Sequence, residues 1–389
     1  MTWKWSPLVR LTMVTVLAVS GTVLSTLTSV NAAVNPAPVP VMLVRANDSS
    51  TVYVVSTTSY FDPAHPAACD PQACYLLKRT TNNGASFTVM NLPHVGYLKN
   101  TIAGTLEDLV FANPRDGYAL VRDGVFSTLF VTSNGASTWH RQTITPGEHV
   151  LLLIANQGQL YALIARCASN HTCTHLRAAR STLSARRWTV TALPRGLPHA
   201  FYSNYFGVTA FGSNVWLTLQ GSKTPLLYIS HNRGTTFTSA PAPSLGSVTA
   251  CSLTAESQSS LWATCPTGMM VSFFYSGDAG AQWVNVDRLG YAGTGGGYFD
   301  PVSSSLAYLD YGQTGPSRPE NLFRITNAGR TSLPAGVLHC DDVFGLVFTD
   351  ARHGLAICNH HSTLASTYLL RTSDGGSTWS QAAAFYERF

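Results

Sequence analysis

The sequence predicts an all-β protein, a seven-bladed β-propeller built from four-stranded antiparallel blades. Three observations predict this fold. An eight-residue string recurs along the chain at intervals of 46 to 52 residues. Short apolar runs separated by turns fill these intervals, and the composition, with 45% hydrophobic, 11% aromatic and 11% charged residues, favours strands over a helical bundle. An interval of nearly fifty residues is typical of a propeller blade.

The recurrent string begins with a hydroxyl residue, has Asp or Asn third and ends on an aromatic residue. Five copies are clear: TTNNGASF from Thr80, TSNGASTW from Thr132, SHNRGTTF from Ser230, SGDAGAQW from Ser276 and TSDGGSTW from Thr372. Residues 181–188 and 325–332 are weaker copies. Asp or Asn can bond backbone amides in a tight turn, Gly supplies positive φ, and the aromatic residue packs on the blade. The residues expected to hold these turns are Asn82, Asn134, Asn232, Asp278, Asn327, Asp374, Trp139, Trp188, Trp283 and Trp379.

Each unit is expected to contain four strands, A to D, with the string as the C–D turn. In the second unit, apolar runs at 109–112, 118–121 and 129–131 precede the string. The A–B turns should then share a face with the strings, and the B–C and D–A loops should share the opposite face. Residues 39–44 are a candidate inner strand of the first blade, and residues 385–389 a candidate end of the last outer strand.

Residues 1–32 have the pattern of a secretory signal peptide. Lys4 and Arg10 precede an apolar stretch over 11–27, and small residues at 30–32 suit a cleavage site. We expect a mature start near Ala33, a short linker over 33–38 and a single propeller over 39–389. An uncleaved signal anchor is the alternative, although the stretch falls short of the roughly 20 residues that a span needs. Either interpretation implies a secreted or extracytoplasmic protein, with no membrane span after cleavage.

The eight cysteines of an exported chain are expected to form disulfides. Their spacing gives four neighbouring couples: Cys69 with Cys74, Cys167 with Cys173, Cys251 with Cys265, and Cys340 with Cys358. The last two couples flank polar turns, so each should face across an antiparallel hairpin. Zinc is the alternative, because several histidines lie near cysteines, but none accompanies a CxxC pair. We therefore expect no metal and no other cofactor.

The string resembles the Asp-box, or BNR repeat, SxDxGxTW, of sialidases, sortilin-type receptors, xyloglucan-degrading hydrolases and photosystem II assembly factors. The form RTSDGGSTW, with Arg371 before the box, and the single seven-unit array most resemble the YVTN/BNR-like photosystem II stability/assembly factor family. The resemblance covers residues 39–389 and implies a propeller with Asp-box C–D hairpins. Because the box resembles a structural element remote from active sites, it implies a fold and not an activity.

The face of the B–C and D–A loops is where we expect a ligand. Its B–C loops have insertions at 59–74, 167–175, 312–321 and 359–366, two of which carry short cysteine couples that limit their freedom. Its D–A loops carry tyrosines and arginines, which suit carbohydrate or peptide recognition. The residues selected for binding are Tyr97, His149, Tyr202, Arg288 and Tyr298.

Catalysis is the alternative class. The FRIT string at 323–326 mimics a sialidase motif, but Arg324 shares its repeat position with Arg79, Arg180 and Arg371, which indicates a scaffold role. No GxSxG string occurs. Another glycosidase could use two carboxylates at the channel mouth. The available carboxylates are Glu107, Asp108, Glu148, Asp341 and Asp342.

The net charge of +5 includes Lys4 and Arg10 of the leader, and the remaining charges form no runs. This positive charge is too weak for nucleic-acid binding. The sequence therefore predicts an exported, non-catalytic, monomeric propeller that binds a protein or glycan partner, or assists assembly, through its B–C and D–A face. The alternative is a secreted glycoside hydrolase, sialidase-like or active on β-glucan or xyloglucan.

Overall fold

The computed structural model describes residues 39–46, 50–57, 75–93, 105–123, 126–168, 173–193, 206–220, 225–243, 251–267, 270–286, 298–311, 320–359 and 367–386. All of them belong to one compact unit, Pro36–Phe389. The predicted signal peptide falls in the other unit, Met1–Asn35, outside the described residues. In the described ranges, no helix has both the length and the apolar character needed to cross a bilayer.

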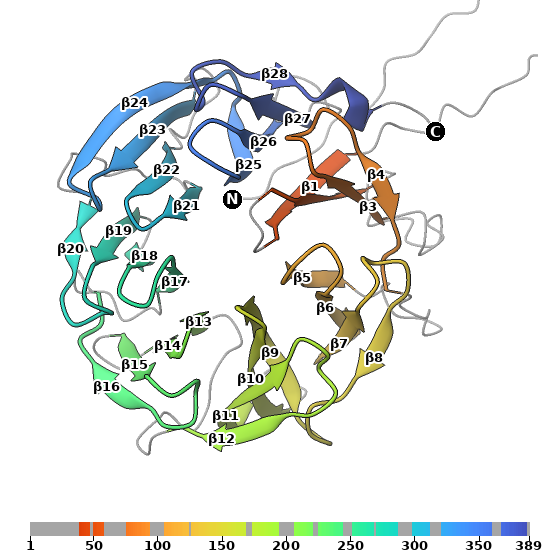
Figure 1. Ribbon diagram of the computed structural model, residues 1–389, viewed down its shortest axis with the longest axis vertical. Helices are drawn as coiled ribbons and strands as arrows, with labels where there is room; N and C mark the ends of the chain where they lie inside the picture. Colours follow the sequence, from red (N-terminus) through yellow and green to blue (C-terminus); the bar gives the residue numbers. More distant parts are fainter. Residues whose placement is uncertain are drawn as a thin grey trace, which may run out of the picture. The chain divides into compact units, whose positions relative to one another are not determined.

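Seven four-stranded antiparallel sheets, each built from consecutive strands, form the seven blades, which confirms the predicted fold. They follow one another around a ring, with the first strand of each blade innermost and the fourth outermost (Figure 1). Blade 1 contains β1 (Val39–Arg45), β2 (Val52–Thr57), β3 (Tyr75–Thr80) and β4 (Thr88–Met90); blade 2 contains β5 (Thr105–Phe111), β6 (Gly117–Asp123), β7 (Phe126–Thr132) and β8 (His140–Gln142); blade 3 contains β9 (His149–Asn156), β10 (Gln159–Cys167), β11 (Cys173–Thr182) and β12 (Thr189–Ala192). Blade 4 contains β13 (Phe206–Phe211), β14 (Asn214–Leu219), β15 (Leu226–Ser230) and β16 (Thr238–Ala240); blade 5 contains β17 (Ser252–Ala255), β18 (Leu261–Thr267), β19 (Met270–Ser276) and β20 (Val284–Asn285). Blade 6 contains β21 (Phe299–Ser303), β22 (Leu306–Tyr311), β23 (Glu320–Thr326) and β24 (Thr331–Leu338); blade 7 contains β25 (Asp342–Phe348), β26 (Gly354–Asn359), β27 (Thr367–Thr372) and β28 (Ser380–Gln381).

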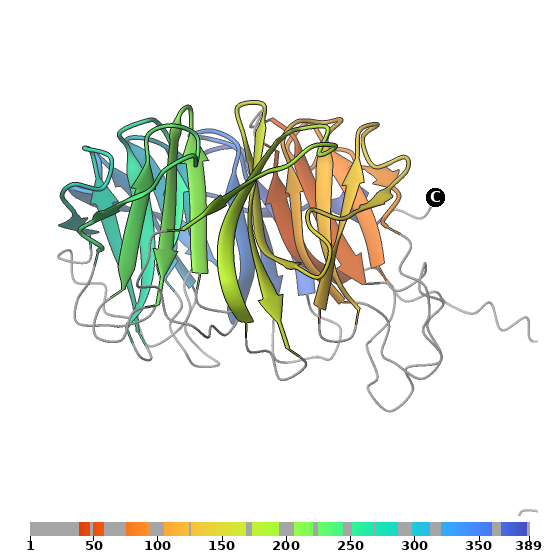
Figure 2. The ribbon, with the colours of Figure 1, turned by 90° about the horizontal axis from the view of Figure 1, so that it is seen from below.

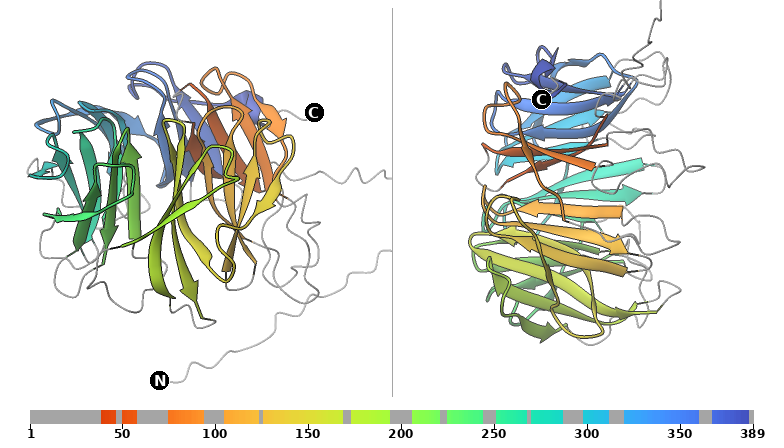
Figure 3. Two further views of the ribbon diagram at one scale, coloured as in Figure 1. Left: turned by 60° about the horizontal axis from the view of Figure 1, so that its bottom comes forward. Right: turned by 90° about the vertical axis from the view of Figure 1, so that its right-hand side faces the viewer.

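The A–B and C–D turns gather on one face of the ring, as predicted (Figure 2). Two other views show the same arrangement of strands and turns (Figure 3). Of the connections on the opposite face, two D–A segments, 143–148 and 339–341, are fully described. The predicted B–C insertions lie wholly or partly outside the described residues, and so do Tyr97, Tyr202 and Arg288.

The recurrent string forms the same hydrogen-bonded turn in its five clear copies. In the second blade, the Thr132 hydroxyl donates to Asn134 Oδ1 (3.0 Å) and accepts the backbone N–H of Ala136 (3.0 Å). Asn134 Oδ1 also accepts the Thr138 N–H (3.0 Å). The fourth and fifth residues have positive φ, at 68° for Gly135 and 66° for Ala136. Equivalent bonds recur at Thr80, Ser230, Ser276 and Thr372.

Buried side chains form one cluster at each of the seven interfaces between neighbouring blades. In each of the first six blades, strand B contributes a buried aromatic ring to these interfaces. Five of the six donate a hydrogen bond to a backbone carbonyl of the next blade: Tyr53 to Pro114, Tyr118 to Leu183, Trp216 to Ala279, Trp262 to Ser303, and Tyr308 to Ala351. The hydroxyl of Tyr161, the sixth, has no such partner among the described residues. Most blades are thus fixed to the next by packing and by one directional bond.

Over the described residues, blades 7 and 1 close the ring without exchanging a strand. Residues 39–44 do form part of the inner strand β1. The C-terminal segment instead turns inward as a short 3₁₀ helix, η3 (Ala383–Phe385), because Phe385 packs fully buried against Phe87 of blade 1. The buried Lys78 ammonium donates to the Phe385 carbonyl (2.5 Å), which fixes this segment to β3.

Three of the four predicted cysteine couples are disulfides: Cys167–Cys173, Cys251–Cys265 and Cys340–Cys358. Each links neighbouring strands of one blade or their ends, so the hairpin prediction is confirmed. Cys69 and Cys74 lie outside the described residues. Within the part of the chain that the structure describes, no group of three or more His, Cys, Asp or Glu side chains could hold a metal ion.

Candidate functional site

Strand A of four consecutive blades contains a β-bulge close to the point where the D–A connection enters. The bulge residues are Phe344 in blade 7, Val41 in blade 1, Glu107 in blade 2 and Leu151 in blade 3, which we call the inner rim. Blades 4 and 5 have regular A–B ladders over their described residues. A bulge redirects a side chain out of the regular alternation of a strand. The inner rim is therefore a local departure from the regular ladders of blades 4 and 5, and the bulge of blade 6, at Val302, lies near the A–B turn of its strand.

Two inner-rim side chains are unusually accessible for large apolar groups. Phe344 is 46% exposed and Val41 is 42% exposed, whereas Glu107 and Leu151 are half-buried. Tyr298, just before β21, is 38% exposed. At the end where the D–A connections enter, the innermost strands thus present an aromatic ring and a valine to solvent.

Glu148, one of the predicted carboxylates, is occupied by ion pairs. Its side chain is only 1% exposed and contacts the guanidinium of Arg177. Arg166, which is 62% exposed, lies with its Nε 3.8 Å from Glu148 Oε1, next to the Cys167–Cys173 disulfide. Removing one partner of such a pair would leave a buried charge uncompensated. Glu148 therefore fits a structural role better than a catalytic one.

Glu107 and Asp108 are neighbours at the bulge of β5. The Ser127 hydroxyl donates to Glu107 Oε2, and Asp108 Oδ1 accepts the N–H of Leu109 (2.9 Å). Burial raises the pKa of Asp108 to about 6, the Leu109 bond opposes this rise, and the Glu107 charge adds to it. Burial thus moves the pKa of Asp108 close to neutrality.

Asp341 and Asp342 lie at the start of the inner strand of blade 7. The backbone N–H of Asp341 donates to the Asn359 carbonyl (2.8 Å), and Asp342 pairs with Asn359 in the β25–β26 ladder. The predicted acidic residues are thus distributed over blades 2, 3 and 7, and only Glu107 and Asp108 share a strand in blade 2.

Two of the predicted binding residues are described. His149 begins β9, and burial lowers its pKa, which favours a neutral imidazole. Burial raises the pKa of Tyr298, and the nearby Asp310 charge adds to the effect. Both residues lie where strand A begins, at the same end of the ring as the inner rim.

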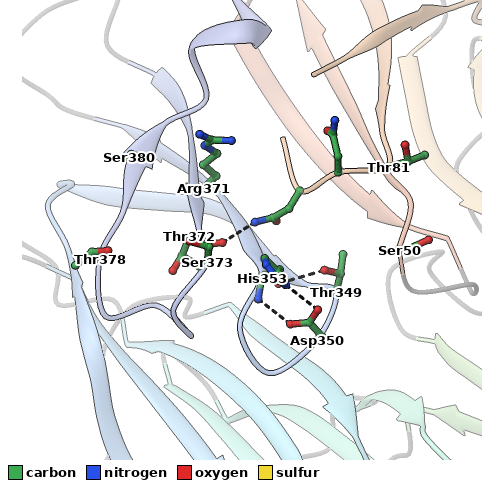
Figure 4. Close-up of a pocket in the computed structure, with 12 residues that line it drawn as sticks. Ser50, Thr81, Thr349, Asp350, His353, Arg371, Thr372, Ser373, Thr378 and Ser380 are labelled. Atoms are coloured by element: carbon green, nitrogen blue, oxygen red, sulfur yellow. Dashed lines mark hydrogen bonds and ion pairs between the residues drawn. The ribbon is translucent and has the colours of Figure 1, made fainter. Parts of the chain in front are cut away.

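A cavity that the sequence did not predict lies on the opposite, turn-bearing face. It has a volume of about 570 Å³ and is found where blades 7 and 1 meet (Figure 4). Asn83 Nδ2 crosses this junction to donate to the Thr372 carbonyl (2.6 Å). The residues lining the cavity are Ser50, Thr81, Asn82, Asn83, Thr349, Asp350, His353, Arg371, Thr372, Ser373, Thr378 and Ser380. Finding it from sequence would have required knowing how the turns of blades 7 and 1 pack against each other.

No protein-family model and no curated protein matches the chain. Solved structures do match. The β-propeller domain of the Trilobed protease from Pyrococcus furiosus is 8% identical, with 90% of this chain and 96% of that chain covered and a TM-score of 0.56. The chain is a seven-bladed β-propeller. A puromycin-hydrolyzing peptidase from Mycobacterium tuberculosis is 9% identical at a TM-score of 0.57; 88% of this chain is covered but only 53% of the peptidase, about half its length.

YCF48 structures also match. YCF48 from Cyanidioschyzon merolae is 13% identical, with 73% of this chain and 86% of that chain covered and a TM-score of 0.48. A structure of YCF48 bound to D1 peptide is 14% identical, with 72% and 81% covered and a TM-score of 0.47. Identities this low leave the function to the residues of this chain.

Proposed function

We propose that this protein is an exported binding module that holds a protein partner against the inner rim and the surrounding B–C and D–A loops, without catalysing a reaction. The observation that carries the proposal is the exposure of Phe344 and Val41 at β-bulges in adjacent blades. Aromatic and aliphatic side chains that protrude from a rigid scaffold are typical anchors of protein interfaces.

The chemistry of the inner rim favours a protein over a glycan. Phe344, Val41 and Leu151 offer apolar surface and no hydrogen bonds to sugar hydroxyls. Arg166 lies close by with its guanidinium largely exposed, so it can bind polar groups at the edge of an apolar contact. We assign His149 and Tyr298, together with Tyr97, Tyr202 and Arg288 of the same loops, to the outer part of this surface.

Other features support export and the proposed relationship. Disulfides persist in oxidising compartments, and the three described here suit the secretory signal peptide predicted over residues 1–32. The repeated hydroxyl–carboxamide turns support an assignment to the Asp-box type, and with it a distant relationship to the BNR-like assembly factors. We expect a monomer, because each blade already packs against two neighbours around a closed ring.

A peptide selection tests the proposal while the partner is still unidentified. Immobilised mature protein is exposed to a phage-displayed random peptide library, with a reduced and denatured sample of the same protein for counter-selection. Enrichment of peptides that share an apolar anchor is the expected result. Repeated selections without enrichment would contradict a protein-binding role.

Glycoside hydrolysis is the second candidate, because one observation favours it. Asp108, with a pKa near 6, lies beside Glu107, and a protonated acid next to a carboxylate is the pairing that glycosidases use. The test is turnover of fluorogenic sialosides and of β-glucan and xyloglucan oligosaccharides by the wild type and by Glu107→Gln, Asp108→Asn and Asp342→Asn. Turnover abolished by one of these substitutions would replace the binding proposal, and we expect none.

A further inference from the structure

The cavity between blades 7 and 1 is polar on every side. All twelve of its lining residues carry a hydroxyl, amide, carboxylate, imidazole or guanidinium group, and none is aliphatic or aromatic apart from the imidazole of His353. Its volume of about 570 Å³ falls within the roughly 300–1,000 Å³ of small-molecule sites. Such a lining excludes an apolar ligand and favours one rich in hydroxyl groups.

The acidic residue of the cavity is engaged within its own turn. Asp350 accepts hydrogen bonds from the backbone N–H groups of Arg352 (2.7 Å) and His353 (2.9 Å), and its Oδ2 lies 2.8 Å from His353 Nδ1. Although partial burial opposes the change, these bonds lower the pKa of Asp350, so it is ionised and its oxygens are already satisfied. Asp350 therefore contributes little to a ligand.

The basic residue of the cavity, Arg371, is not engaged by neighbouring groups as Asp350 is. The Arg371 guanidinium has no hydrogen-bond or ion-pair partner among the described residues. Arg180, at the same repeat position in blade 3, donates from Nη1 to the Arg233 carbonyl of the next blade (3.0 Å). Figure 4 shows Arg371 projecting beside Ser380, apart from Asp350 at the other end of the cavity. The guanidinium is thus available to a ligand.

A second unsatisfied group lies at the same place. Asn83 Nδ2 donates to the Thr372 carbonyl, but Asn83 Oδ1 is buried and has no hydrogen-bond partner among the described residues. A buried amide oxygen without a donor is costly, and a ligand hydroxyl could supply that donor. The lining therefore combines a guanidinium without a protein partner and an amide whose buried oxygen lacks a donor.

From this combination, we propose that the cavity between blades 7 and 1 binds a uronic acid, the carboxylated sugar unit of acidic polysaccharides. The Arg371 fork matches a carboxylate with two parallel hydrogen bonds. The surrounding hydroxyls and amides match the ring hydroxyls of the sugar. The site lies on the turn-bearing face and is separate from the inner rim. This proposal therefore does not depend on the function proposed above.

Calorimetric titration of the mature protein with D-glucuronate tests the proposal, with D-glucose as the neutral match and acetate as a carboxylate without hydroxyls. We expect saturable binding of glucuronate and at least about tenfold weaker binding of glucose and acetate. Arg371→Gln should weaken glucuronate binding at least about tenfold. Thr81→Trp, which fills the cavity from an exposed position and keeps Arg371, should abolish it.

The matched control is Arg324→Gln, the same substitution at the same repeat position of blade 6. Arg324 is exposed and does not line the cavity, so this variant should bind glucuronate like the wild type. Absence of glucuronate binding to the wild type would overturn the proposal. Equal binding of acetate, or equal losses in Arg371→Gln and Arg324→Gln, would overturn it as well.

Discussion

A single hydroxyl organises the C–D turn in each of the five clear copies of the string. The Thr132 side chain is fully buried, and its Oγ1 accepts the Ala136 N–H and donates to Asn134 Oδ1. Two successive residues with positive φ can be held in this turn because the hydroxyl and the amide satisfy the backbone groups that the turn would otherwise leave unpaired. The five clear copies therefore keep the same hydrogen-bond donors and acceptors, and the residue types vary around them.

Replacing Thr132 with Val keeps the shape of the side chain and removes the hydroxyl. The buried N–H of Ala136 then loses its acceptor, so we expect the free energy of unfolding to fall by about 1–3 kcal/mol. Urea unfolding followed by circular dichroism measures this change. Thr189→Val, at an exposed position of β12, should stay within about 0.5 kcal/mol of the wild type. Equal effects of the two substitutions would contradict the role given to Thr132.

The short helix η3 is the element that closes the ring. Phe385 is fully buried, and its ring lies 5.3 Å from that of Phe87 in an edge-to-face contact. Lys78, only 3% exposed, donates to the Phe385 carbonyl and lies 4.6 Å from the centre of the Phe385 ring. The end of the last blade thus depends on a strand of the first.

Phe385→Ala removes the central side chain of this closure. Substitutions of a buried Phe by Ala cost about 3–5 kcal/mol, and we expect a loss of that size in chemical unfolding. Leu333→Ala, on the outer strand β24 and 57% exposed, is the control and should change little. A loss below about 1 kcal/mol for Phe385→Ala would indicate that η3 does not hold the ring closed.

At the scale of the whole ring, one arginine links three blades. Arg45, at the end of β1, donates to the carbonyls of Phe348 in blade 7 (2.6 Å) and Pro301 in blade 6 (2.8 Å) and lies 3.9 Å from Asp300. Asp300 Oδ2 accepts the Phe348 N–H (2.5 Å). Burial raises the pKa of Asp300 to about 6 and that of Glu256 in blade 5 to about 7, and in both the Arg45 charge opposes the rise.

These shifts predict an unusual pH dependence. Because both pKa values are higher in the folded chain than in the unfolded one, the folded chain binds protons more tightly. The resulting stabilisation is complete below about pH 4 and is lost as the pH rises through about 6 to 7. Thermal unfolding should therefore occur several degrees higher at pH 5 than at pH 8.

A double variant, Asp300→Asn with Glu256→Gln, should reduce this difference in melting temperature. The carboxamide oxygen introduced by the first substitution can still accept the Phe348 N–H, so the variant loses the titrating groups and keeps this hydrogen bond. Hydrogen bonds, chiefly from Thr378, lower the pKa of Asp374 to about 2. Its titration therefore changes stability only at more acidic pH and does not affect the comparison of pH 5 with pH 8. A melting temperature that falls from pH 8 to pH 5 would contradict the assignment.

How much of the fold could be predicted from sequence depends on how far apart in the chain the interacting residues lie. The turn strings and cysteine couples are local, so the blade number, the turn face and the three described disulfides follow from spacing. The strand-B aromatics, such as Trp216 and Tyr308, lie in apolar runs where any hydrophobic residue fits the pattern. Their role depends on a carbonyl of the next blade, which the sequence does not place beside them.

The candidate site was harder to predict for the same reason. The bulges that expose Phe344 and Val41 depend on the A–B register and not on a motif, and the polar cavity depends on how the turns of blades 7 and 1 pack against each other. Glu148 is a related case: its type and position suit a catalytic carboxylate, and the sequence does not show that Arg177 and Arg166 of neighbouring strands pair with it.

The affinity of the protein for a selected peptide, measured by fluorescence anisotropy with two matched variants, tests the central claim most directly. Phe344→Asp places a charge on the inner rim, and Leu333→Asp places the same charge on a comparably accessible apolar residue of β24. We predict that Phe344→Asp weakens binding at least about tenfold, or about 1.4 kcal/mol, while Leu333→Asp leaves it unchanged. Unchanged affinity in Phe344→Asp, or equal losses in both variants, would contradict the claim that the inner rim binds the partner.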